Sequence, residues 1–282
     1  MSTLLRCGGR SLDWASPTVM GVINVTPDSF SDGGRYLDPE QALARALAIE
    51  AEGAAIIDLG GESTRPGAAP VTAQEELQRV LPLLERLRPR TRAILSIDTS
   101  KPEVMRAAAA AGADLINDVY ALRAPGALEA AAESGCAVCL MHMQGEPRTM
   151  QRKPHYIDVV GEVRAFLAER RDACRAAGIA DARIVLDPGF GFGKSLEHNL
   201  ALLRRLREID VDGLPILAGL SRKASIGALT GKSPGERVYG SVAAALIAAQ
   251  RGANILRVHD VAATVDALKV LAAVAARPPP AQ

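Results

Sequence analysis

The chain has 282 residues, of which 48% are hydrophobic and 23% are charged, and its formal net charge is +1 at pH 7. This composition is close to that of an ordinary globular protein. A nearly neutral chain creates no strong long-range field, so neither nucleic acid nor an anionic membrane is expected as a partner. Any anion site must therefore be built locally.

The N-terminus and the cysteines indicate the compartment. Residues 1–10 lack the apolar run of a signal peptide, and the apolar stretch 242–249 is too short to span a bilayer. Cys136 and Cys139 have a C-x-x-C spacing, but they lie in a strand-like run, where a separation of three residues places the side chains on opposite faces. No second cysteine pair completes a zinc site in the sequence, so we expect buried thiols in a reducing compartment, the cytoplasm.

Short apolar runs recur along the chain and alternate with helical stretches. Each run is continuously apolar, which is typical of parallel strands that are covered on both faces. The expected strands are residues 18–24, 54–60, 93–99, 114–119, 137–143, 183–189, 215–221 and 254–260.

Start and stop signals frame the helices between these runs. Asp38 and Pro39 indicate the first turn of a helix that ends at Gly53. Other signals are the capping-box patterns Thr72-x-x-Glu75, Ser100-x-x-Glu103 and Ser233-x-x-Glu236, and the terminating glycines Gly112, Gly178 and Gly252.

Eight strands that alternate with helices, without a break in composition, predict one (β/α)8 TIM barrel over residues 1–276. The last residues, 277–282, contain three prolines and are expected to form a flexible tail. A doubly wound open sheet is the structural alternative, because periodicity alone does not exclude it.

Polar or glycine-rich residues follow nearly every apolar run. In a barrel the carboxyl ends of the strands meet at one rim, where barrel active sites lie. One such residue is as readily explained as a capped or solvated loop residue, but eight ends together favour a site. The clusters are Asn24; Asp58 with 60–62; Asp98; Asn117 and Asp118; His142; Asp187; 221–223; and Arg257 with His259.

These residue types suggest the chemistry of the site. Asp98, Asn117 and Asp187 are hydrogen-bond acceptors within apolar runs, and such groups are costly to bury unless they bind donors. A flat heterocycle with an amino-amidine edge supplies paired donors of this kind. The candidate ligands for phosphate or carboxylate are Arg65, Lys223, Arg257 and His259, and the candidate oxygen ligands for a magnesium–diphosphate unit are Asn24 and Asp32.

Three glycine-rich segments are expected to act as functional loops. Residues 26–37 and 60–71 are long enough to act as lids. The segment GFGFGKS, residues 189–195, resembles a phosphate-binding loop but has Pro188 where that motif needs glycine, so we expect close backbone approach to a ligand instead. For Phe190 and Phe192, a position that lines a ligand ring and a position in the core are equally compatible with the sequence. For His142, a place in the site and a place in the core are likewise both open.

The loops and strand ends together resemble the dihydropteroate synthase family. The resemblance runs in order through nearly the whole chain, and the set of motifs is far more specific than any one of them. The motifs are NVTPDSFSDGG (24–34), GGESTRPGA (60–68), SIDTSKPEV (96–104), LMHMQGEPRTMQ (140–151), LDPGFGFGKS (186–195), GLSRKASIG (219–227) and LRVHDV (256–261).

The resemblance implies a role for individual residues and a homodimer. Asp98, Asn117, Asp187 and Lys223 match the residues that hold the pterin ring, and Asn24 and Asp32 match residues linked to Mg²⁺. The remaining matches are Thr64, Arg65, Arg257 and His259 for diphosphate and anion contacts, Ser221 for the carboxylate of 4-aminobenzoate, and Phe30, Pro66 and Phe192 near its amine.

The reaction that this resemblance implies joins a pterin methyl diphosphate to 4-aminobenzoate and releases diphosphate. Asp98, Asp32, Arg65 and Lys223 are the expected catalytic residues, and a dissociative path is expected because the amine is a weak nucleophile. The alternatives are a corrinoid-linked methyltetrahydrofolate methyltransferase, which has no diphosphate to bind, and a pterin-binding protein without activity.

Overall fold

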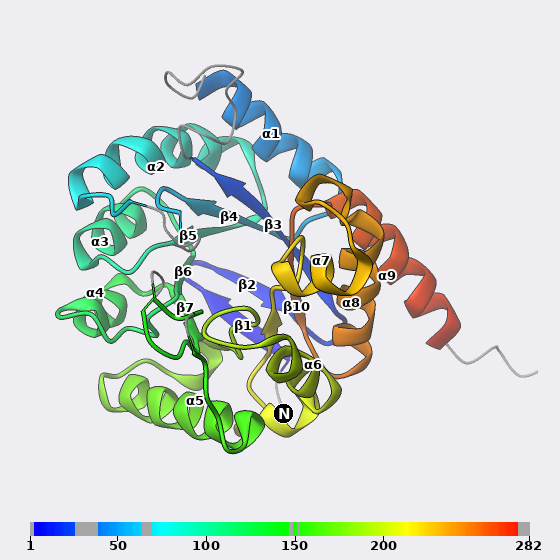
Figure 1. Cartoon of the computed structure of the whole chain (residues 1–282). Coiled ribbons are helices and arrows are strands. Elements are labelled where there is room, and N and C mark those ends of the chain that lie inside the picture. The colour runs from blue at the N-terminus through cyan, green and yellow to red at the C-terminus, as the bar shows by residue number, and fades with distance from the viewer. Residues whose placement is uncertain (1–2, 26–38, 64–68, 147–148, 152, 276–282) are drawn as a thin grey trace, which may run out of the picture.

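The centre of the molecule is a ring of parallel strands (Figure 1). The computed structural model describes residues 3–25, 39–63, 69–146, 149–151 and 153–275. The strands of the ring are β3 (Thr18–Asn24), β4 (Ile56–Gly60), β5 (Ile94–Asp98), β6 (Leu115–Asp118), β7 (Ala137–Met141), β8 (Ile184–Asp187), β9 (Leu217–Ala218) and β10 (Ile255–Val258).

Closure of this sheet distinguishes the predicted barrel from the alternative of an open, doubly wound sheet. Hydrogen bonds link the strands in the order β8-β7-β6-β5-β4-β3-β10-β9, and a parallel bridge between Leu186 and Ile216 joins the two ends. The sheet is therefore a closed barrel. The predicted (β/α)8 fold is confirmed, and the open, doubly wound sheet is excluded.

Helices surround the barrel on its outer side (Figure 1). They are α1 (Pro39–Ala51), α2 (Ala73–Leu87), α3 (Pro102–Ala110), α4 (Ala127–Ser134), α5 (Val159–Ala176), α6 (Leu196–Arg204), α7 (Ala224–Thr230), α8 (Val238–Gln250) and α9 (Val261–Ala275). Short 3₁₀ turns cover 88–90, 181–183, 206–209 and 234–236. Among the described residues, no helix is both long and apolar enough to cross a membrane.

The predicted helix signals hold with two corrections. Thr72 forms the expected capping box with Glu75 at the start of α2, and glycines with positive φ follow α1, α3, α5 and α8. The capping box at Ser233 is present but begins only the 3₁₀ turn at 234–236. The capping box predicted at Ser100 is wrong, because α3 begins one residue later than that pattern requires and the Ser100 hydroxyl donates to Asp118 instead.

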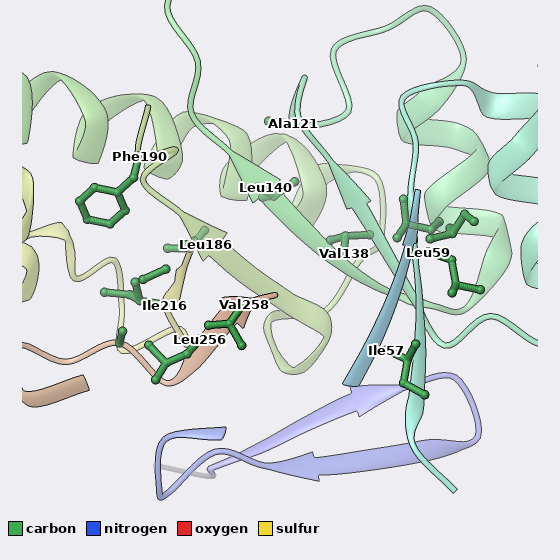
Figure 2. Packing of buried hydrophobic residues seen from close by; sticks show 14 of the residues in the cluster. Ile57, Leu59, Ala121, Val138, Leu140, Leu186, Phe190, Ile216, Leu256 and Val258 are labelled. Carbon is green, nitrogen blue, oxygen red and sulfur yellow. The ribbon is translucent and has the colours of Figure 1, made fainter. Parts of the chain in front are cut away.

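The side chains of each strand alternate between two environments. Outward-facing residues such as Ile57, Val138 and Leu256 pack beneath the helices, and Figure 2 shows part of this layer. Inward-facing residues such as Ile56 and Leu115 fill the amino-terminal half of the barrel. This period of two decides which polar residues face the interior.

An antiparallel hairpin that the sequence analysis did not predict closes the amino-terminal end of the barrel. Its strands are β1 (Leu4–Cys7) and β2 (Arg10–Asp13), and both are drawn across the centre of the ring in Figure 1. Leu5, Cys7 and Leu12 are buried and pack on the inward-facing residues of the barrel. The hairpin therefore seals the end of the barrel opposite the predicted site.

The cysteines occupy the positions expected from their spacing. Cys139 lies inside the barrel, whereas Cys136 lies in the layer beneath the helices, so the two thiols are on opposite faces as predicted. All four cysteines are buried free thiols that form no disulfide. The tail at 277–282 lies outside the described residues.

Candidate active site at the carboxyl end of the barrel

The polar residues of the strand ends meet because they occupy inward-facing positions. Asp58 and Gly60 alternate with outward-facing residues on β4, as do Ser96 and Asp98 on β5. Parallel pairing then places Asp98 beside Asn117 of β6. Asp187 and Arg257 have the same position near the ends of β8 and β10, so one interior layer is polar.

Asp58 accepts hydrogen bonds from three strands at the base of this layer. Its carboxylate accepts from Ser96 Oγ at 2.6 Å, from Asn117 Nδ2 at 3.2 Å and from Arg257 Nε at 2.6 Å. Asp58 is fully buried, so these donors replace its lost hydration. Asp58 was expected only as one member of a polar strand-end cluster, and the geometry makes it the anchor of Arg257 and Asn117.

Arg257 also donates to Asp98, from Nη2 to Oδ2 at 2.7 Å. Burial raises the pKa of Asp98 to about 7, and the nearby Asp58 adds to the rise, although Arg257 opposes both. The two carboxylates raise the pKa of Arg257, so this guanidinium stays charged. Near neutral pH the Asp98 carboxyl is therefore poised between its protonated and ionised forms.

Asp187 and Lys223 interact electrostatically within the layer, without a direct hydrogen bond between them. Asp187 accepts from the backbone N–H of Gly189 at 2.7 Å. Burial raises the pKa of Asp187 while Lys223 opposes the rise. The Lys223 ammonium donates to the carbonyl of Phe190 and lies 4.7 Å from the ring centre of Phe192. Burial lowers the pKa of Lys223 to about 8, and Asp187 opposes that change.

Ser221 and His259 lie at the rim beside this layer. The Ser221 hydroxyl is 3.1 Å from His259 Nδ1 and accepts from the His259 backbone N–H at 3.2 Å. Arg222 has a φ of +58° and donates to Asp260 at 3.0 Å from Nε. The positive φ lies at the residue between Ser221 and Lys223, and the Arg222 side chain pairs with Asp260.

Asn24 offers an oxygen ligand next to Asp98. A Cβ atom at Gly60 would lie 3.8 Å from Asn24 Oδ1 and 3.9 Å from Asp98 Oδ2, so the glycine leaves space between the two oxygens. Amide and carboxylate oxygens suit Mg²⁺, which usually takes its other ligands from water and substrate phosphates. Within the described ranges, no group of three or more His, Cys, Asp and Glu side chains could by itself hold a metal ion.

Several predicted site residues lie outside the described residues: Phe30, Asp32, Thr64, Arg65 and Pro66. The start of the loop at 60–71 is described, and Glu62 links it to neighbouring segments. Glu62 accepts from Val71 N at 3.2 Å and from the ammonium of Lys101, which also donates to the fully buried Glu76.

The two phenylalanines of the glycine-rich segment have different positions. Phe190 is a core residue, 1% exposed, whereas Phe192 is half-buried beside Lys223. His142 is buried and contacts Lys194, a lysine that sequence reasoning missed because nothing local distinguishes it from a solvated one. His155 is exposed, and His198 is half-buried in the cap of α6.

The fold and site define a class: barrel enzymes that bind a flat polar heterocycle against buried carboxylates with cations close by. The family model described as "Pterin binding enzyme" matches residues 20–259. The dihydropteroate synthase of Escherichia coli (strain K12) is 55% identical over 265 residues, which cover 94% of each chain.

Two solved structures agree with this class. A Xanthomonas albilineans dihydropteroate synthase with 4-aminobenzoic acid has a TM-score of 0.93 and 58% identity, covering 99% of this chain and 100% of that one. A Yersinia pestis dihydropteroate synthase in a sulfonamide drug complex has a TM-score of 0.92 and 52% identity, covering 96% and 98%. The chain belongs to the pterin-binding enzymes and, among them, to the dihydropteroate synthase family of transferases.

Proposed function

We propose that this enzyme condenses (7,8-dihydropterin-6-yl)methyl diphosphate with 4-aminobenzoate, giving 7,8-dihydropteroate and diphosphate for folate biosynthesis. The observation that carries the proposal is the buried charged layer in which Arg257 joins Asp58 to Asp98, with Asp187 and Lys223 beside it. The names of the relatives support the same reaction.

The pterin is expected to lie against this layer. Its amino and ring N–H groups donate to carboxylates, and Asn117 provides an amide at the same level. One carboxylate oxygen of Asp187 accepts from the backbone N–H of Gly189. The other oxygen is expected to accept from the pterin. The ammonium of Lys223 then binds the carbonyl oxygen of the ring, because Lys223 is the cation of this layer that has no carboxylate within ion-pair distance among the described residues.

The leaving diphosphate is expected at the rim, near Asn24, Arg257 and His259. Asn24, together with Asp32 of the first loop, would hold Mg²⁺, and the ion would supply positive charge for the departing diphosphate. Arg257 is already charged and anchored by Asp58, so it does not have to reorganise as negative charge develops on the leaving group.

A dissociative path follows from the charges of the layer. As the bond from the pterin methylene carbon to the diphosphate oxygen breaks, positive charge spreads into the ring, and the Asp98 carboxylate stabilises that charge. The 4-aminobenzoate nitrogen then forms the new bond and loses a proton. Ser221, held beside His259, is placed to contact the benzoate carboxylate.

The decisive assay follows both products. Purified protein with pterin methyl diphosphate, 4-aminobenzoate and Mg²⁺ should form dihydropteroate and diphosphate in equal amounts, and chelation of the metal should stop both. Methyl transfer from methyltetrahydrofolate without diphosphate release would favour the corrinoid-linked alternative. Binding of the pterin diphosphate without product would favour a pterin-binding protein without activity.

Sulfonamides provide a second test, because the Yersinia pestis relative forms a sulfonamide complex. They mimic 4-aminobenzoate, so inhibition here should be competitive with 4-aminobenzoate and not with the pterin. Inhibition that is noncompetitive with 4-aminobenzoate would contradict a shared pocket.

A homodimer and a cytoplasmic location belong to the same proposal. Large apolar side chains are exposed on two helices that pack side by side, Tyr239 and Ile247 on α8 and Val270 and Val274 on α9. A second copy would cover this surface, and light scattering after size exclusion tests it. The free thiols support a reducing compartment.

A further inference from the structure

The segment 189–193 after β8 has no helix or strand, yet its backbone is closely confined. Gly189, Gly191 and Gly193 have φ angles of +67°, +80° and +62°. A Cβ at Gly189 would lie 1.9 Å from the carbonyl oxygen of His142, and a Cβ at Gly193 would lie 2.3 Å from that of Gln144. The segment therefore lies directly against the loop after β7, and only glycine fits at these positions.

Side chains donate to every carbonyl oxygen of this segment. Such donors take the place of the backbone partners that a helix or strand would supply. The pairs are Lys194 with Gly189 and Phe192, Lys223 with Phe190, Gln151 with Gly191, and Tyr156 with Gly193.

Lys194 has the most demanding position of these donors, since it is only 3% exposed. Its Nζ lies 2.9 Å from Gly189 O, 3.0 Å from Phe192 O and 2.9 Å from His142 Nδ1. Burial lowers the pKa of His142 to about 3, so its ring is neutral and Nδ1 can accept. The carbonyl oxygen of His142, at 3.4 Å, is a fourth acceptor near Nζ. Burial lowers the pKa of Lys194 to about 7, and even the neutral amine keeps two N–H donors for the carbonyls of Gly189 and Phe192.

The two carbonyls that Lys194 holds belong to the segment that contacts Lys223. Gly189 precedes Phe190, whose carbonyl accepts from Lys223, and Phe192 is itself the residue whose ring lies beneath that ammonium. Fixing Gly189 O and Phe192 O therefore fixes both contacts of Lys223. Lys194 does not line the pterin layer, because its ammonium is enclosed by the two loops.

Resting on the proposed function, we propose that Lys194 is a positioning residue for pterin binding, which acts by holding the glycine-rich segment so that Phe190 and Phe192 orient Lys223. The purely structural alternative is that Lys194 only satisfies buried carbonyls. The two readings differ in one respect: a positioning residue depends on Lys223 for its effect on the substrate.

A double-mutant cycle separates these readings. Lys194→Met and Lys223→Met are each expected to raise KM for the pterin diphosphate about tenfold, the loss typical of leaving a buried hydrogen-bond acceptor without its donor. The double variant should exceed Lys223→Met by less than about twofold, because the effect of Lys194 passes through Lys223. Lys269→Met, at an exposed lysine of α9, should match the wild type. Multiplicative losses in the double variant, or an unchanged KM in Lys194→Met, would overturn the proposal.

A crystal structure of Lys194→Met tests the same point without activity. The Lys223 ammonium should leave the Phe190 carbonyl, and its retention there would refute the positioning role. Lys194→Gln, which keeps a neutral donor, serves if the methionine variant does not fold. If the wild type forms no dihydropteroate, the proposed function fails. The crystal structure of Lys194→Met would still show whether Lys194 positions Lys223.

Discussion

Arg257 Nη2 lies 2.7 Å from Asp98 Oδ2 in the inward-facing layer, and the same guanidinium lies 2.6 Å from Asp58 through Nε. One cation thus donates to two buried carboxyl groups from neighbouring strands. This arrangement keeps the Arg257 guanidinium charged before any substrate enters, and its N–H donors explain why the strands tolerate aspartates inside a barrel.

Arg257→Met should destabilise the fold as well as the reaction. Removal of one partner leaves buried carboxylates without their cation, which costs about 3–5 kcal/mol. Urea unfolding measures the loss, and Arg106→Met, which breaks an exposed pair with Glu133, should cost less than about 1 kcal/mol. Equal losses in the two variants would show that the buried pair contributes no more than a surface one. Asp58→Asn added to Arg257→Met should restore part of the stability.

Pterin affinity should increase as the pH rises through about 7, the pKa to which burial raises Asp98. Below that pH the carboxyl is protonated and is a poorer acceptor for the N–H groups of the ring, so binding releases a proton. Calorimetry in buffers of different ionisation enthalpy measures this proton. Asp98→Asn should bind more weakly and lose the pH dependence between pH 6 and 8; an unchanged profile in that variant would assign the proton to another group.

Lys223 should set the alkaline side of the same profile. Burial lowers the pKa of Lys223 to about 8, so the ammonium loses its charge above that pH and KM for the pterin should rise. Lys223→Arg should keep its charge and move this change to higher pH, because a guanidinium does not titrate in that range. If the alkaline change stayed in place in Lys223→Arg, it would belong to a different residue.

Asn24→Ala should weaken magnesium-dependent binding of the pterin diphosphate. The loss of one oxygen ligand is expected to raise the apparent Kd for the metal about tenfold, equivalent to about 1.4 kcal/mol. Electron paramagnetic resonance of Mn²⁺ in the presence of the pterin diphosphate follows the metal without turnover. Asn24→Asp retains an oxygen at the same place and should bind the ion at least as well as the wild type; weakened binding in both variants would point to a steric effect.

Leu5→Ala should lower the free energy of unfolding by about 2–5 kcal/mol, the cost of deleting a buried leucine side chain. Leu5 is 1% exposed at the closed end of the barrel, whereas the neighbouring Leu4 is 48% exposed. Leu4→Ala is therefore the matched control and should have a small effect. Catalytic constants should be unchanged in both, because the hairpin lies at the end of the barrel opposite the site. A similar small loss in both variants would mean that the hairpin is not part of the cooperative fold.

Local patterns were enough to predict the strands, most helix ends and the barrel. The continuous apolar runs became strands because both of their faces are covered, and the polar residues at their carboxyl ends became one layer because closure of the barrel brings those ends together. The same reasoning predicts a shared location for seven residues, and the structure brings them together at the carboxyl end of the barrel: Asp98, Asn117, Asp187, Ser221, Lys223, Arg257 and His259. Their roles in binding and catalysis stay predictions.

Only the tertiary structure decided which groups pair. Arg257 donates to Asp58, which lies 199 residues earlier in the chain. Ser100 does not cap α3 as expected, because β6 places the Asp118 carboxylate within reach of its hydroxyl. The hairpin at 4–13 has too short a pattern to reveal that it closes a barrel, and Lys194 resembles a solvated lysine until two loops enclose it. Local sequence encodes backbone periodicity, whereas burial and long-range pairing depend on the register in which the barrel closes.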